Sequence, residues 1–279
     1  MEHQLLAVDE GRQRLSLVDT RDPGAGWTLS LDELPLARDL QRLGPDRALI
    51  GYDRGFFELE IGTGAVSNVC DRWRDVTAVR RLPDGSTLVT GTNLDGTDVD
   101  GTDGTHGNDG IFVLTLDGEL RETARIRRDG DYVRLMRPVL DGYLLCSNDH
   151  ILETDLALNE RRRLQAPGFE HAWMAQRQPD GTTLVSAGYG AFMARFDVRG
   201  ALIGTFGRSG EVAPEVSPFF YATFQVLADG RIVVANWQGH GPDNGGKGRQ
   251  LLEFSPSGKL LDSWSDPEKI SSLQGILVL

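Results

Sequence analysis

A seven-residue segment recurs six times along the chain, and its spacing strongly restricts the possible folds. Each copy is an apolar run that closes on polar or aromatic residues, and the copies occupy residues 4–10, 47–53, 87–93, 143–149, 183–189 and 231–237. Their first residues lie 43, 40, 56, 40 and 48 positions apart. A period of about 40–50 residues made of short strands is typical of a β-propeller. Because the repeat continues from end to end without a linker, we predict one domain over residues 1–279.

Tight glycine turns divide each repeat into four strands. Asp-Gly pairs occur at residues 84–85, 141–142, 180–181 and 229–230. This dipeptide supplies the positive φ that two-residue hairpin turns require. The recurring segment is then the second strand of each blade, counted from the axis outward.

The two ends of the chain complete one blade between them. The first copy, residues 4–10, has no strand before it, whereas the apolar segment 273–279 has no strand after it. Placed before Met1, that segment supplies the missing innermost strand and removes the free sheet edges of an open ring. The sequence therefore predicts an all-β, six-bladed propeller closed by its C-terminal strand, since a seventh blade would need a seventh copy.

Charge and composition exclude several classes of partner. The net charge of −12 argues against nucleic acid and against an anionic membrane surface. No apolar stretch approaches the roughly 20 residues that span a bilayer, and residues 1–4 carry no leader signal. Cys70 and Cys146 are expected in different blades, without a disulfide, which suits a reducing compartment. We therefore expect a cytoplasmic protein whose partner is a small molecule.

The C-terminal third carries a family resemblance in residues 234–240 (Val-Ala-Asn-Trp-Gln-Gly-His), 251–260 and 271–275. With the repeat, these segments resemble six-bladed propellers of the NHL-repeat and gluconolactonase-like superfamily. Gluconolactonase-like enzymes hold calcium at the axis, but this sequence does not reproduce their ligand pattern. The tryptophan-docking repeats of quinoproteins are absent, so pyrroloquinoline quinone is not expected. The glycines of residues 238–249 follow no strand-to-helix pattern, so no nucleotide is expected either.

The two faces of such a propeller differ in their loops. One face, the loop face, carries the loops between second and third strands and the connections from one blade to the next. The other, the turn face, carries the tight glycine turns, and we expect little room for a site there. Four of the five histidines (His106, His150, His171 and His240) fall on the loop face, while His3 falls on the turn face. Convergent imidazoles suit a divalent metal or acid–base chemistry near neutral pH.

We predict a site at the centre of the loop face, with His171 as its central group because it begins an axial strand beside Glu170 and Trp173. The predicted catalytic residues are His171, His150, Glu170, Asp149 and Tyr189. A single divalent ion (Zn, Mn or Ca) is predicted on His150, His171 and His240.

Aromatic rings with carboxylates and amides are typical of sites that stack a sugar ring and bind its hydroxyls. The predicted substrate-binding residues are Trp173, Trp237, Arg134, Tyr132, Asn236, Asp53, Gln274 and Tyr221. Two alternatives remain open: the aromatic rings pack between blades, and Arg134 pairs with Asp131 rather than with a substrate carboxylate.

The segment 95–109 repeats Asp-Gly-Thr and gives the longest repeat spacing. Its alternating carboxylates suit calcium, but it lacks the glutamate of an EF-hand loop. The alternatives are a lid that delivers His106 or Asp109, and a solvated acidic loop.

These patterns favour an enzyme that acts on a polyhydroxylated substrate: a sugar, a glycosylated compound or a lactone. Histidine and carboxylate groups would carry out elimination, epimerisation or hydrolysis, with or without the metal. The alternative is a non-catalytic propeller that binds a ligand or a protein. In that case the histidines do not converge and apolar side chains plug the funnel.

Overall fold

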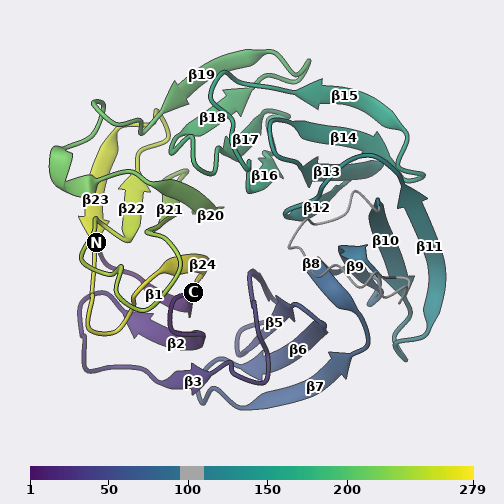
Figure 1. Ribbon diagram of the computed structural model, residues 1–279, viewed down its shortest axis with the longest axis horizontal. Coiled ribbons are helices and arrows are strands. Elements are labelled where there is room, and N and C mark those ends of the chain that lie inside the picture. Colours follow the sequence, from purple (N-terminus) through teal and green to yellow (C-terminus); the bar gives the residue numbers. More distant parts are fainter. Residues whose placement is uncertain (95–109) are drawn as a thin grey trace.

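The protein is a ring of six four-stranded antiparallel sheets around a central axis (Figure 1). The computed structural model describes residues 1–94 and 110–279. The predictions for residues 95–109, including His106 and Asp109, therefore lie outside the described residues. Within the described part, one short 3₁₀ helix, Pro214–Val216, is the helical element, and no helix is long and apolar enough to cross a membrane.

Each blade has four strands, ordered below from the axis outward. They are β24 (Leu273–Val278), β1 (Gln4–Asp9), β2 (Arg14–Asp19) and β3 (Thr28–Ser30) in blade 1; β4 (Asp39–Arg42), β5 (Arg47–Tyr52), β6 (Gly55–Glu60) and β7 (Val66–Asp71) in blade 2; β8 (Arg74–Arg81), β9 (Thr87–Asn93), β10 (Ile111–Leu116) and β11 (Glu122–Arg128) in blade 3; β12 (Met136–Val139), β13 (Gly142–Cys146), β14 (Ile151–Asp155) and β15 (Glu160–Leu164) in blade 4; β16 (Met174–Arg177), β17 (Thr183–Ser186), β18 (Met193–Phe196) and β19 (Leu202–Phe206) in blade 5; and β20 (Phe220–Val226), β21 (Ile232–Trp237), β22 (Leu251–Phe254) and β23 (Leu260–Trp264) in blade 6.

The predicted closure of the ring is confirmed. Strand β24 pairs antiparallel with β1, from Leu5 opposite Val278 to Asp9 opposite Leu273. Asp9 reinforces this junction, because its buried carboxylate accepts the backbone N–H groups of Ser271 (2.9 Å) and Ser272 (2.8 Å). Blade 1 is therefore built from both ends of the chain.

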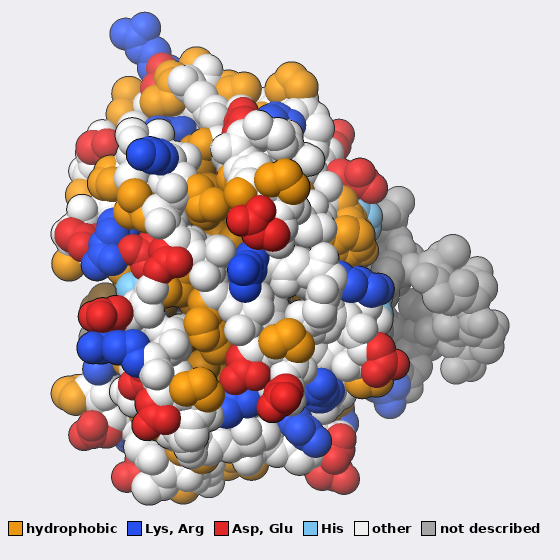
Figure 2. Space-filling model, turned by 90° about the vertical axis from the view of Figure 1, so that its left-hand side faces the viewer, with side chains coloured by type: hydrophobic (Ala, Val, Ile, Leu, Met, Phe, Trp, Pro, Cys, Tyr) orange, Lys and Arg blue, Asp and Glu red, His pale blue; other side chains and the backbone are white. Residues whose placement is uncertain are grey.

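The recurring segment is apolar because second strands are buried between neighbouring blades. All residues of β13 and β21 are buried, as are all but the first of β1 and β5. Outer strands face solvent: in β7, Cys70 is the buried position. Cys70 and Cys146 lie on β7 and β13, in different blades. On the side of the molecule shown in Figure 2, acidic and basic side chains are interspersed over the outer strands.

Polar side chains near the axis connect the innermost strands of neighbouring blades. They hydrogen-bond to the backbone of the next blade, a few residues from each central mouth. The bonds run from Val79 N–H to Asp39 (3.0 Å), from Gln41 to the carbonyl of Arg81 (2.8 Å), from Ile276 N–H to Thr223 (2.9 Å) and from Val278 N–H to Gln225 (2.9 Å). These bonds fix the spacing of strands that surround both mouths.

Candidate functional site

A cavity of about 360 Å³ opens at the centre of the loop face. Side chains from all six blades line it, because the innermost strands begin here and the second strands end here. The lining residues are Glu10, Leu36, Arg38, Asp53, Asp75, Thr77, Thr92, Tyr132, Arg134, His171, Trp173, Tyr189, Phe220, Trp237, His240 and Gln274. We call it the loop-face cavity.

The structure brings nine of the sequence-predicted residues together around this cavity. They are His171, Tyr189, Trp173, Trp237, Arg134, Tyr132, Asp53, Gln274 and His240. Five others are absent from its lining: His150, Glu170, Asp149, Asn236 and Tyr221.

His150 is buried, but it is engaged in a separate polar network. Its Nδ1 contacts Asp149 at 2.7 Å, and its Nε2 lies 3.1 Å from the Arg163 guanidinium and 3.4 Å from Asp131. Both ring nitrogens therefore have partners outside the cavity. The structure does not gather His150, His171 and His240 at one point, and residues 1–94 and 110–279 hold no group of three or more His, Cys, Asp or Glu side chains arranged for a metal. The side chains of Asp149 and Glu170 face solvent.

Tyr221 and Asn236 stabilise the scaffold. The Tyr221 hydroxyl donates to the carbonyl of Gly207 (2.6 Å), and burial raises the pKa of this phenol. The Asn236 carboxamide accepts from Phe219 N–H (2.9 Å) and donates to the carbonyl of Arg249 (2.8 Å). Asn236 thus anchors two loops of blade 6 instead of facing the cavity.

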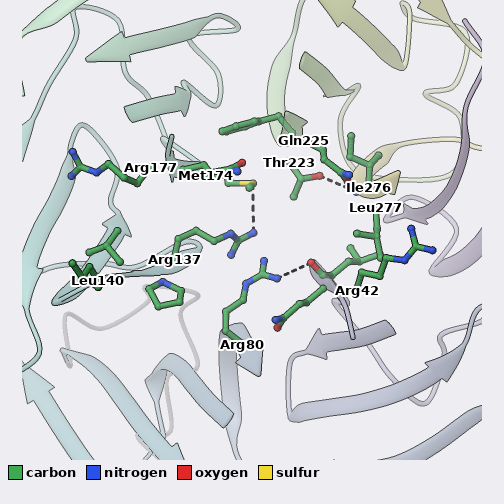
Figure 3. A pocket seen from close by; sticks show the side chains of 16 residues that line it. Arg42, Arg80, Arg137, Leu140, Met174, Arg177, Thr223, Gln225, Ile276 and Leu277 are labelled. Carbon is green, nitrogen blue, oxygen red and sulfur yellow. Dashed lines mark hydrogen bonds between the residues drawn. The ribbon is translucent and has the colours of Figure 1, made fainter. Parts of the chain in front are cut away.

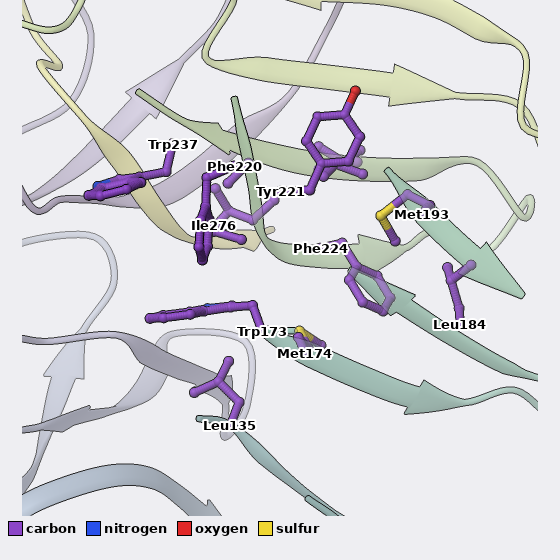
Figure 4. Close-up of a cluster of buried hydrophobic side chains, with 14 of the residues drawn as sticks. Leu135, Trp173, Met174, Leu184, Met193, Phe220, Tyr221, Phe224, Trp237 and Ile276 are labelled. Atoms are coloured by element: carbon purple, nitrogen blue, oxygen red, sulfur yellow. The ribbon is translucent and has the colours of Figure 1, made fainter. Parts of the chain in front are cut away.

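Aromatic rings form one wall of the cavity. Phe220 lies at the centre of this wall, with ring centroids 5.5 Å from Trp173, 4.8 Å from Tyr189 and 5.2 Å from Trp237, all edge to face. Figure 4 shows Trp237, Phe220 and Trp173 one below another, with Leu135 below Trp173. Trp173 is 4% exposed, and its indole N–H has no hydrogen-bond partner in the part of the chain that the structure describes. The wall therefore offers apolar faces together with one unused donor.

Arg134 is a cation without a carboxylate partner in the described part of the chain. Its guanidinium lies over the rings of Tyr132 (4.5 Å) and Trp173 (5.8 Å), and it donates through Nη2 to His171 Nδ1. The Nε of Arg134 has no hydrogen-bond partner within residues 1–94 and 110–279. The alternative pairing with Asp131 is wrong, because Asp131 binds Arg128 at 3.1 Å. Burial lowers the pKa of Arg134, as expected for a desolvated cation whose charge is not balanced.

His171 is held neutral beside this arginine. Its backbone has φ +55°, and its ring meets Tyr189 edge to face at 5.4 Å. Burial, followed by the charge of Arg134, lowers the His171 pKa, and Glu170 opposes this shift weakly. Because Nδ1 accepts from Arg134, the ring proton lies on Nε2. His171 therefore offers a hydrogen-bond donor to a ligand.

Carboxylates line other parts of the cavity. Glu10 accepts from the Trp237 indole N–H (3.2 Å) and lies 2.8 Å from His240 Nδ1. Burial raises the pKa of Asp53, which makes it a stronger base than an ordinary aspartate. Arg38 opposes this rise, and Asp75 adds to it. The cavity thus combines a cation without a carboxylate partner among the described residues, several carboxylates and a wall of aromatic rings packed edge to face.

Five of the lining residues were not singled out in the sequence: Leu36, Arg38, Thr77, Thr92 and Phe220. Arg38 precedes the short strand β4, and Phe220 begins β20 directly before the predicted Tyr221. Glu10 and Asp75 lie at strand ends, where the repeat places residues of the rim.

No family model and no curated protein match the chain. Solved structures do. A protein of unknown function from Bacteroides caccae has a TM-score of 0.78 at 16% identity, over 100% of this chain and 99% of that one. A chain of the nidogen/laminin complex has a TM-score of 0.66 at 12% identity, over 99% and 97%. The WD40 β-propeller domain of Doa1 has a TM-score of 0.64 at 12% identity, over 99% and 85%.

At these identities the likeness shows the fold alone. It confirms the six-bladed propeller together with the sheet topology. The resemblance to the NHL-repeat and gluconolactonase-like superfamily stays a prediction.

Proposed function

We propose that the protein is an enzyme that acts on a carboxylate-bearing polyhydroxylated compound, a sugar acid, in the loop-face cavity. The observation that carries this proposal is the unpaired Arg134 guanidinium in a cavity that carboxylates and aromatic rings also line. An arginine fork suits a carboxylate, carboxylates accept hydrogen bonds from sugar hydroxyls, and the rings of Trp173 and Phe220 suit the apolar face of a sugar.

The chemistry that fits this lining is proton abstraction next to the carboxylate. Asp53 takes the proton from the α-carbon as the C–H bond breaks, and the electron pair moves into the carboxylate to give an enediolate. Arg134 stabilises that charge, and His171 donates a hydrogen bond through Nε2. Delivery of a proton from water to the opposite face, with release of the Asp53 proton to solvent, gives epimerisation. Departure of a β-hydroxyl as water, with the proton that Asp53 took, gives elimination.

The alternative is a non-catalytic ligand-binding propeller. The apolar wall of Trp173, Phe220 and Trp237 favours it, because these buried rings supply binding surface but no acid or base. The same sugar acid would then bind without turnover.

The test combines binding with hydrogen exchange. We expect aldonates or uronates such as glucuronate to bind in calorimetry more tightly than neutral glucose. In D₂O, NMR should detect deuterium entering at the carbon next to the carboxylate. Asp53→Asn should reduce this exchange by about 100-fold or more, the usual contribution of a general base, while retaining binding.

Asp141→Asn is the matched control. It makes the same chemical change on a solvent-exposed side chain in the turn between β12 and β13, away from the loop-face cavity, so exchange should be unaffected. Binding without exchange supports the non-catalytic alternative. If no sugar acid binds in preference to the neutral sugar, the proposal is wrong.

The pH dependence of binding should report on His171. The positive charge of Arg134 lowers the pKa of His171, and a carboxylate bound at Arg134 would offset that charge. Binding should therefore raise the pKa of His171, so that His171 takes up a proton in the complex. Affinity should therefore rise as the pH falls through the pKa of His171 in the complex, by at most about tenfold per unit for one proton. Calorimetry from pH 7.5 to 5 measures this slope.

His171→Gln serves as the comparison for this slope, because glutamine keeps polar contacts without titrating. This substitution should reduce the pH dependence of the affinity to the part that carboxylates contribute at lower pH. A slope retained in His171→Gln would assign the proton to another group.

A further inference from the structure

A second cavity, of about 550 Å³, opens at the opposite mouth of the axis, on the turn face. The expectation that this face has little room for a site is therefore wrong. The turns are short, but the ends of the six innermost strands leave a hollow inside the ring of turns. Figure 3 shows Arg80, Arg137 and Met174 around this hollow, with Arg42 and Arg177 at its rim. We call it the turn-face cavity.

Its charge is unbalanced. The guanidinium groups of Arg80 and Arg137 share one fully buried carboxylate, that of Asp39, with Arg137 Nη2 at 3.0 Å from Oδ1. The described residues that line the cavity include four arginines and no aspartate or glutamate. This cationic lining lies in a chain whose net charge is −12. Positive charge is therefore concentrated in this cavity, although the chain as a whole is acidic.

The buried donors are also incompletely satisfied. Arg80 is only 8% exposed, and its Nε has no hydrogen-bond partner among the described residues. Arg137 Nη2 reaches the sulfur of Met174 at 3.5 Å, and a thioether is a weak acceptor. Burial, followed by the charge of Arg137, lowers the pKa of Arg80 to about 9. An oxyanion at this point would satisfy the donors and relieve the repulsion between the two cations.

The two rim arginines have partners of their own and are not part of the Arg80–Arg137 pair. Arg42 donates to the carbonyls of Gly44 and Pro45 in its own turn. Arg177 binds Glu153 at 2.8 Å, away from the Arg80–Arg137 pair.

Much of the remaining lining is apolar. Val139, Leu140, Phe224, Ile276 and Leu277 line the cavity with the arginine pair, and Leu140 is fully exposed. The other polar lining residues are Gln41, Gln176, Thr223 and Gln225. A volume of about 550 Å³ lies within the range of pockets for small organic ligands, which runs from roughly 300 to 1,000 Å³.

We propose that the turn-face cavity is a second binding site, for an organic anion. The ligand would carry a carboxylate or phosphate group on an apolar body. The oxyanion would bind Arg80 and Arg137, and the body would contact Phe224 and Ile276. This site is independent of the function proposed for the loop-face cavity.

Calorimetry with phenyl phosphate, benzoate and neutral benzyl alcohol tests the proposal. The full chain carries Arg134→Gln, so that the loop-face cavity does not contribute an anion site. We expect at least one of the two anions to bind about tenfold or more tightly than benzyl alcohol, since charge-assisted hydrogen bonds are the strong ones. Which anion binds better distinguishes a phosphate ligand from a carboxylate ligand.

Two further variants locate the binding. Arg137→Gln should weaken the anion about tenfold or more, whereas Arg199→Gln, which makes the same change at an outer turn between β18 and β19, should leave affinity unchanged. Gln176→Trp fills the cavity without touching the guanidinium pair and should also abolish binding, which keeps the test valid if Arg137→Gln is unstable. Equal affinity for benzyl alcohol, or unchanged binding in Gln176→Trp, would overturn the proposal.

Discussion

Replacement of Arg134 by glutamine is expected to weaken the binding of a sugar acid about 100-fold without lowering the melting temperature. The guanidinium is desolvated over Tyr132 and Trp173 and has no carboxylate partner in the described residues, so the folded protein gains little from its charge. A ligand carboxylate would gain two charge-assisted hydrogen bonds there, each worth about 1.5–3 kcal/mol. Function and stability should therefore respond in opposite directions to the same change.

The measurement pairs calorimetry with a thermal melt. In Arg134→Gln the melting temperature should stay constant or rise by a few degrees, since about 1 kcal/mol moves it by roughly 2–4 °C in a domain of this size. Arg134→Lys keeps the charge but loses the planar fork, and it should recover only part of the affinity. A lower melting temperature with unchanged affinity would show that Arg134 is structural.

Removal of residues 275–279 is expected to unfold the protein or lower its melting temperature by more than about 10 °C. The deletion removes the buried side chains of Ile276, Leu277 and Val278, each worth about 1.5–3 kcal/mol. Their sum approaches the stability of many whole proteins, about 5–15 kcal/mol. It also exposes the edge of β1, an unpaired strand that favours aggregation. Circular dichroism melts and light scattering measure both effects.

A rearranged chain tests whether the instability of the truncated protein comes from the lost pairing of β24 with β1. Leu279 N–H donates to the carbonyl of Gln4 at 2.9 Å, so the ends of β24 and β1 are already adjacent. Residues 273–279 placed before Met1 through a short glycine-serine linker should restore the melting temperature. The same linker alone, added to the truncated chain, should not. A truncated chain that melts like the intact protein would show that closure contributes little.

The fold was predictable because its signals are local or repeated. Asp-Gly turns mark the hairpins, and the missing first strand together with the unpaired segment 273–279 indicates the closure. These signals do not depend on which way any one side chain points.

The site was predictable only in part, because side-chain direction changes with every residue of a strand. On β20, Tyr221 was predicted to bind substrate, but Phe220 lines the cavity and Tyr221 donates to Gly207. His150 and His171 are both buried or half-buried histidines near the ends of strands. Their partners, Arg163 for one and Arg134 for the other, come from segments that only the folded chain brings near.

The turn-face cavity could not be predicted for a related reason. Asp39, Arg80 and Arg137 belong to blades 2, 3 and 4, and no spacing in the sequence relates them. Short turns indicated a flat face, whereas the hollow depends on how the innermost strands diverge around the axis.

The closure of blade 1 also has a consequence for the order of folding. Within blades 2 to 6, each strand pairs with its neighbour in the sequence, so these contacts form between nearby segments. The bond between Ser272 and Asp9 joins residues 263 positions apart. The entropy of closing so long a loop is lost before any contact in the junction is gained. The junction between β24 and β1 is therefore the slowest to form from the unfolded chain, and variants that weaken it should alter the folding rate of the ring as well as its stability.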